Sequence, residues 1–288
     1  MMGVLYSYGV LLKPKVTLAL LALYVTSFLT SSLFFGGGPF QTRWFFVGFM
    51  AVAFAVTGSN GLNCYIDRDI DARMARTSGR PLVLGSILPR SALAFSLTMM
   101  ASAALIALWL GATPVLILVV GAGSYLLLYS MFLKRRSIWN VLANAPSVAA
   151  PAWFGWYMGG APLFPIGLLM GGLVAIWGPL HLWSLAYAFR KDYLRVGVPM
   201  LSTALPDDKA VKSIQAALIV LVASSYLLTP WTGSLFYVAI VTAMNIPLLA
   251  IGRSLSGGNP KMSAWRLFKL SAPYIVLLFS AFMVCQVI

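Results

Sequence analysis

The chain has 288 residues, of which 60% are hydrophobic and 9% charged, and its mean hydropathy is +0.90. This composition excludes a soluble globular domain and is typical of a polytopic membrane protein. The formal net charge is +14, but we expect no nucleic-acid partner, because the basic residues lie in short segments beside apolar stretches. One histidine, His181, excludes a multi-histidine metal site, and the distant cysteines Cys64 and Cys285 predict neither a disulfide nor a zinc site.

Nine apolar stretches are long enough to cross a hydrocarbon layer of about 30 Å. We therefore predict an all-α protein with nine transmembrane helices, in which the lipid bilayer is the main surrounding partner. The predicted spans run over residues 16–35, 44–65, 91–110, 114–132, 139–158, 164–188, 211–229, 234–251 and 270–288. Since no segment has the composition of a soluble domain, we treat residues 1–288 as a single transmembrane domain.

The basic residues predict the orientation of these spans. With a cytoplasmic N-terminus, every Lys and Arg except Arg43 falls in a cytoplasmic segment, as the positive-inside rule requires. All six acidic residues fall on the same side. We expect a multi-pass protein of the cell membrane whose N-terminus and active-site loops are cytoplasmic.

Three of the six acidic residues stand together after the second predicted span. If the helix continues through them, Asn63, Asp67 and Asp71 recur every four residues and share one face. Asp69 would lie about 200° from Asp67 around that helix, so we expect it to point away and pair with Arg73. An amide and two carboxylates on one stripe are oxygen ligands suited to Mg²⁺, which also binds substrate phosphates.

Arginines follow these aspartates along the chain. Arg76 and Arg80 carry guanidinium groups, which suit phosphate oxygens. Acids for a metal ion and arginines for phosphate predict a diphosphate site at the membrane surface. The alternative is a solvated loop with local ion pairs, in which orientation in the membrane alone explains the arginines.

The string from Asn63 to Leu82, NCYIDRDIDARMARTSGRPL, resembles the first aspartate-rich motif of the UbiA superfamily of membrane prenyltransferases, in its protoheme IX farnesyltransferase (heme O synthase) branch. Segments 129–140, 146–160 and 177–201 are similar to the same branch, and the resemblance covers roughly residues 10–280. Many superfamily members carry a second DxxxD motif. Here Asp192 is followed four residues later by Val196, which favours the heme-directed branch and leaves the number of metal ions open.

This resemblance implies Mg²⁺-dependent transfer of a farnesyl group from farnesyl diphosphate to a vinyl group of heme B. The products are heme O, which carries a hydroxyethylfarnesyl side chain, and diphosphate, so heme is a substrate and not a permanent cofactor. Asp67, Asp71 and Asp192 are the implied catalytic residues. The implied metal ligands are Asn63, Asp67, Asp71 and Asp192, and the candidates for diphosphate binding are Arg76, Arg80, Lys134 and, more weakly, Lys191.

His181 and several aromatic residues are candidates for contact with heme or the prenyl chain. His181 lies about three helical turns before Asp192, inside the sixth predicted span, where a lone histidine is a functional candidate. It could ligate the heme iron, handle a proton or only hydrogen-bond between helices. The aromatic candidates are Tyr65, Trp156 and Tyr193, whose rings could steady a carbocation or simply pack in the membrane.

Other functions stay open at this stage. A related enzyme could act on a quinone precursor or a glycerophosphate lipid, but the missing second DxxxD disfavours it. A transporter would place charges near the bilayer midplane, whereas these lie at one face. A non-catalytic assembly partner of a respiratory oxidase could keep an intact metal site without turnover.

Overall fold

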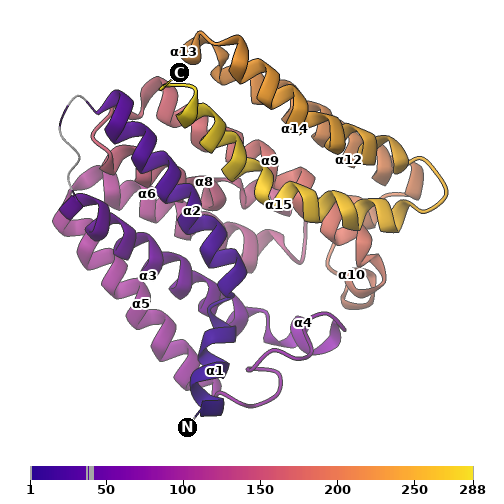
Figure 1. Ribbon diagram of the computed structural model, residues 1–288. Coiled ribbons are helices and arrows are strands. Elements are labelled where there is room, and N and C mark those ends of the chain that lie inside the picture. Colours follow the sequence, from indigo (N-terminus) through magenta and orange to yellow (C-terminus); the bar gives the residue numbers. More distant parts are fainter. Residues whose placement is uncertain (1, 37, 39–41, 288) are drawn as a thin grey trace.

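The computed structural model describes residues 2–36, 38 and 42–287, which form a bundle of long helices (Figure 1). Within that part, eight helices are long and apolar enough to cross a membrane. They are α2 (Pro14–Thr30) with its continuation to Phe35, α3 (Thr42–Ile66), α5 (Pro89–Leu110), α6 (Ala112–Gly123) with its continuation to Leu133, α9 (Leu168–Ala188) with the turn before it, α12 (Asp207–Ser224) with α13 (Thr229–Thr232), α14 (Leu235–Ser254), and α15 (Pro260–Val284). The all-α, multi-pass architecture predicted from composition is confirmed.

The fifth of the nine predicted spans is also helical, but it is short and divided. Residues 139–158 form α7 (Asn140–Ala143) and α8 (Ala145–Met158), which meet at Asn144. Pro146 lies in the first turn of α8, where its missing N–H cannot support a helix continuing from α7. With only 14 residues, α8 is too short to be counted among the eight long spans.

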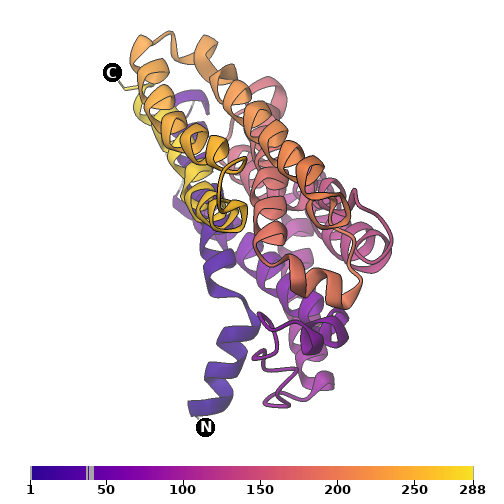
Figure 2. The ribbon, with the colours of Figure 1, turned by 90° about the vertical axis from the view of Figure 1, so that its right-hand side faces the viewer.

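Three short helices, of which α4 (Arg68–Arg73) and α10 (Arg190–Val196) are polar, gather at one end of the bundle. Helices α1 (Met2–Leu11), α4 and α10 lie toward the end where the chain begins, whereas α13 and the C-terminal region lie at the opposite end (Figures 1 and 2). The two acidic segments predicted to share one side of the membrane, around Asp67 and around Asp192, are therefore at the same end of the molecule. Helix α11 (Leu201–Ala204) connects this end to α12.

The centre of the bundle depends on close contacts between α2, α8, α9 and α15. A Cβ at Gly155 of α8 would lie 2.3 Å from the backbone oxygen of Tyr24 in α2, so only glycine allows this approach. Nearby, Ser31 Oγ donates to the Trp156 carbonyl at 2.6 Å. In contrast, α5 exposes large apolar side chains such as Leu105 and Trp109, as a lipid-facing helix does.

Candidate active site

The helical register continues from α3 into α4 through the aspartate cluster. The Asp67 amide donates to the Asn63 carbonyl at 2.9 Å, and the Asp71 amide donates to the Asp67 carbonyl at 2.8 Å. Asn63, Asp67 and Asp71 are consequently buried on one face, with exposed fractions of 3%, 0% and 3%. The Asp69 side chain is 53% exposed on the other side, as the helical spacing predicted.

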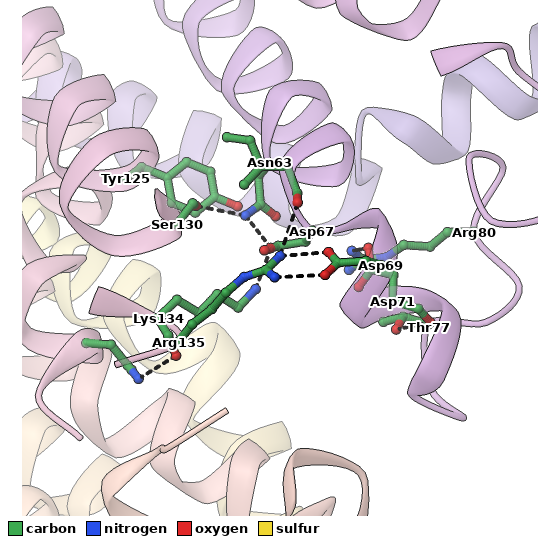
Figure 3. A network of polar contacts seen from close by, with 12 residues as sticks. Asn63, Asp67, Asp69, Asp71, Thr77, Arg80, Tyr125, Ser130, Lys134 and Arg135 are labelled. Carbon is green, nitrogen blue, oxygen red and sulfur yellow. Dashed lines mark hydrogen bonds and ion pairs between the residues drawn. The ribbon is translucent and has the colours of Figure 1, made fainter. Parts of the chain in front are cut away.

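Each buried carboxylate of the stripe lies against a cation from another segment. Lys134, just after the helix that ends at Leu133, pairs with Asp67, and Arg80, from the segment between α4 and α5, pairs with Asp71 (Figure 3). Burial alone would lower the pKa of Lys134, but the adjacent Tyr129 and Asp67 raise it well above its ordinary value. Lys134 therefore remains charged at neutral pH.

Asn63 connects the aspartates to two further segments of the chain. Its Nδ2 donates to Asp67 Oδ2 at 2.7 Å and to Ser130 Oγ at 2.9 Å, while its Oδ1 accepts from Lys13 Nζ at 2.7 Å. Lys13 also donates to the Tyr125 hydroxyl at 3.3 Å. In this state the amide orients Asp67, and its role as a metal ligand stays a prediction. Lys13 is absent from the site residues expected from the sequence, although its position just before the first predicted span places it on the same side of the membrane as the aspartates.

The exposed Asp69 has a different partner from the one expected. Its carboxylate binds the Arg135 guanidinium through both oxygens, at 2.7 and 2.8 Å, and Arg135 also donates to the Ile66 carbonyl at 3.3 Å (Figure 3). The Asp69–Arg73 ion pair predicted from spacing is wrong, because Arg73 reaches the Asp69 backbone carbonyl instead. The partner comes from a loop that the local sequence pattern could not identify.

The second acidic segment meets the first through Asp192. This residue of α10 is 8% exposed and accepts a hydrogen bond from the Arg76 backbone N–H at 3.3 Å, across 116 positions of sequence. The Arg76 guanidinium lies 5.8 Å from the centre of the Phe189 ring. The structure thus brings together the two polar segments that the sequence analysis singled out.

A cavity of about 740 Å³ extends from this cluster into the bundle. Its polar end is lined by Lys13, Asn63, Asp71, Arg76, Arg80 and Lys134. Further inside, its wall is mainly apolar and includes Val52, Ile117 and Phe154. Tyr193 and His181, both predicted to meet substrate, also line this cavity. A site with a charged mouth and an apolar interior suits a ligand with a phosphate head and a hydrocarbon tail.

Three predicted contact residues lie away from this cavity, whose wall among the described residues does not include Tyr65, Trp156 or Lys191. Tyr65 stacks under the Arg68 guanidinium at 4.6 Å. Trp156 is 1% exposed and donates to the Pro162 carbonyl at 2.8 Å, as a packing residue does. Lys191 is on the exposed face of α10. This geometry gives no support to the substrate contacts expected of these residues.

The residues present fit a magnesium ion whose remaining ligands come from the substrate and water. Asp67 Oδ1 is buried and has no hydrogen-bond partner in the described part of the chain, and such an atom is costly unless something binds it. Over the same residues, no three His, Cys, Asp or Glu side chains are gathered closely enough to hold a metal alone. Mg²⁺ typically uses one or two carboxylates and takes its remaining ligands from phosphate and water.

Comparison with known proteins identifies the family of the chain. The UbiA prenyltransferase family matches residues 7–272. The chain belongs to the UbiA prenyltransferase family. Within it, the chain is 35% identical to the protoheme IX farnesyltransferase of Desulforudis audaxviator, over 84% of this chain and 77% of that one. It is 34% identical to the protoheme IX farnesyltransferase of Pyrobaculum arsenaticum, over 94% and 96% of the two chains.

Solved structures of lower sequence similarity show the same fold. A digeranylgeranylglyceryl phosphate synthase is 18% identical, with a TM-score of 0.79 over the full length of both chains. A UbiA homologue from Archaeoglobus fulgidus, solved with GPP and Mg²⁺, is 18% identical, with a TM-score of 0.73 over 98% of this chain and 100% of that one.

Proposed function

We propose that this UbiA prenyltransferase transfers a farnesyl group from farnesyl diphosphate to a vinyl group of heme B, giving heme O and diphosphate. The names of its relatives support this choice of donor and acceptor, because the shared identity extends over most of each chain. The aspartate stripe facing Lys134 and Arg80 supports the diphosphate half of the reaction.

The observation that carries the proposal is the buried Asp67 carboxylate, which is held by Lys134 and Asn63 through one oxygen while the other has no partner in the described chain. A cation bound there would satisfy the second oxygen. Asp67 and Asp71 are accordingly the proposed Mg²⁺ ligands. Mg²⁺, when bound, would neutralise charge that develops on the departing diphosphate.

The basic residues of the site would then change partners. We expect Lys134 and Arg80 to turn from Asp67 and Asp71 toward phosphate oxygens, because a bound cation takes over the neutralisation of the carboxylates. Arg76 lines the same cavity and would add a third phosphate contact. Asp192, which accepts from the Arg76 amide, would hold this loop against α10 and is the proposed additional metal-side carboxylate.

The reaction balances without an oxidant or reductant. The C1–O bond of farnesyl diphosphate breaks, and the electron pair leaves with the diphosphate. C1 then bonds to the terminal carbon of the vinyl group, and the cation left on the inner vinyl carbon takes up water and releases one proton. The apolar wall around Val52, Ile117 and Phe154 suits the farnesyl chain and keeps bulk water from the allylic cation.

The acceptor is tested by the dependence of diphosphate release on the second substrate. Membranes containing the protein receive farnesyl diphosphate, Mg²⁺ and one of three acceptors: heme B, a quinone precursor or a glycerophosphate lipid. The proposal requires release with heme B well above the rate without acceptor. Release with one of the other two but not with heme B would replace heme as the acceptor and leave the prenyltransferase assignment intact.

The proposed orientation puts the N-terminus and the polar end of the cavity in the cytoplasm. Its support is the distribution of basic residues, of which only Arg43 falls on the opposite side of the predicted topology. A cysteine introduced at the exposed Arg73 should react with a membrane-impermeant thiol reagent only after cells are opened. Labelling in intact cells would reverse the orientation.

A further inference from the structure

His181 takes part in a hydrogen-bond chain between α9 and α15. Ser271 Oγ donates its only hydrogen to the Phe268 carbonyl at 3.0 Å. With that hydrogen so used, we assign the 2.9 Å contact between His181 Nδ1 and Ser271 Oγ to an Nδ1–H that donates to the Ser271 oxygen. Nε2 keeps a free lone pair, and it has no hydrogen-bond partner among the described residues.

The His181 ring is also fixed in orientation. Trp177 stacks on it at a centroid distance of 4.5 Å, and Phe268 lies at 4.3 Å. Trp177 is itself anchored, since its Nε1 donates to the Ser271 carbonyl at 2.7 Å. An Nδ1–H bonded to a second residue, with a rigid ring and a free Nε2 on a cavity wall, is the arrangement that protein histidines use to bind metals.

Two lysines on the same cavity have no carboxylate partner in the part of the chain that the structure describes. Lys269 follows Phe268 on α15, and Lys15 is in the first turn of α2; both side chains are exposed and line the cavity. The ion pairs found in that part use Lys134, Arg80 and other arginines. Lys269 Nζ lies 4.9 Å from the Trp265 ring centre.

We propose that the heme substrate binds with its iron on His181 Nε2 and its propionates against Lys269 and Lys15. Heme carries one metal ion and two carboxylates, and the cavity wall offers one imidazole nitrogen without a partner and two ammonium groups without a carboxylate partner in the described chain. The propionates are on the porphyrin edge opposite the vinyl groups. Binding them at these lysines would direct the vinyl edge toward the rest of the cavity, whose wall includes Asp71 and Arg80.

This inference rests on the proposed heme acceptor, and binding tests it without turnover. Detergent-solubilised full-length protein is titrated with heme B in the absence of farnesyl diphosphate, and absorbance and electron paramagnetic resonance report the iron ligand. Wild type should give the spectrum of histidine-ligated heme. His181→Ala should lose it, and added imidazole should restore it. An unchanged spectrum in His181→Ala would overturn the iron assignment.

Binding of metal-free protoporphyrin IX distinguishes the loss of an iron ligand in His181→Ala from a general loss of folding or packing. If His181 acts through iron, His181→Ala should bind this porphyrin, followed by its fluorescence, as tightly as wild type. A matching loss for heme and for the metal-free porphyrin would overturn iron ligation in favour of packing. Heme that binds through His181 but is not farnesylated would reject the proposed function and keep the binding site.

The propionate contacts are tested by removing the charge of the lysines in one experiment and the charge of the propionates in another. Lys269→Gln and Lys15→Gln should each weaken heme B binding about fivefold, as expected for one partly exposed ion pair. The matched control is Lys261→Gln, an exposed lysine of α15 away from the cavity wall, which should bind as wild type. The dimethyl ester of heme B should bind all four proteins equally. Equal heme B affinity in Lys269→Gln, Lys15→Gln and wild type would overturn this orientation.

Discussion

Lys13 Nζ lies 2.7 Å from Asn63 Oδ1, although the two residues are 50 positions apart. This bond joins the turn before α2 to the aspartate stripe at the end of α3. Lys13 adopts a left-handed backbone conformation, with φ of 50°, which costs a non-glycine residue about 1 kcal/mol. The Lys13 carbonyl accepts hydrogen bonds from the Val16 and Thr17 amides in the first turn of α2. These bonds help to hold Lys13 in this conformation.

The first prediction concerns pH. Burial lowers the pKa of Lys13 from its ordinary value to about 8. Below that pH the ammonium is charged and orients Asn63; above it the proton is lost, so turnover should fall as pH rises through about 8. Lys13→Arg should move this fall to higher pH, because the guanidinium stays charged. An identical alkaline limb in wild type and Lys13→Arg would assign the titration to another group.

The aspartates should differ sharply in importance. Asp67→Asn keeps the shape of a fully buried side chain but removes the charge proposed to bind Mg²⁺, and turnover should drop at least about 100-fold, as is typical when a catalytic electrostatic contact is lost. Asp69→Asn removes only the exposed pair with Arg135 and should retain most activity. Equal loss in the two variants would show that the helical face does not define the site.

Metal removal should act on diphosphate binding as well as on turnover. Chelation of divalent cations should weaken binding of a non-hydrolysable farnesyl diphosphate analogue to the wild-type protein. Without the metal ion, the carboxylates of Asp67 and Asp71 repel the diphosphate. They also keep Lys134 and Arg80 in ion pairs, so these cations are not available to the phosphate oxygens. Asp67→Asn should bind the analogue with little response to Mg²⁺. Calorimetry with and without chelator measures both. A full Mg²⁺ response in the variant would contradict the assignment of this ligand.

The contact between α2 and α8 predicts a stability effect separate from chemistry. Gly155→Ala would put a Cβ 2.3 Å from the Tyr24 carbonyl oxygen, and the helices must separate at a cost of about 1–3 kcal/mol. Gly172→Ala in α9 is the matched control, since a Cβ there meets nothing within 4 Å. Thermal unfolding in detergent should be lowered only by the first change. Equal unfolding temperatures would show that α2 and α8 adjust without cost.

Local patterns predicted the parts of this site that follow from periodicity. Four-residue spacing placed Asn63, Asp67 and Asp71 on one buried face and left Asp69 outside, because the helix continues through the cluster. Hydropathy located the spans for a different reason: each span must be long enough to cross a hydrocarbon layer of fixed thickness.

Partners brought by tertiary packing could not be predicted in this way. Arg135 reaches Asp69 from a loop 66 residues away, and Lys13 reaches Asn63 from before the first span. The sequence also could not distinguish a packing ring from a cavity ring. Trp156 and Tyr193 are both aromatic and both buried, but only Tyr193 is part of the cavity wall formed by the described residues.

The central claim is that heme B receives the farnesyl group at the site built on Asp67. Membranes containing wild-type protein or Asp67→Asn are incubated with heme B, farnesyl diphosphate and Mg²⁺, and the extracted hemes are analysed by mass spectrometry. The account predicts a heme heavier by one farnesyl group and one hydroxyl group in the wild-type sample, and unmodified heme B in the variant. Unmodified heme B in both samples, while farnesyl diphosphate is consumed, would contradict it.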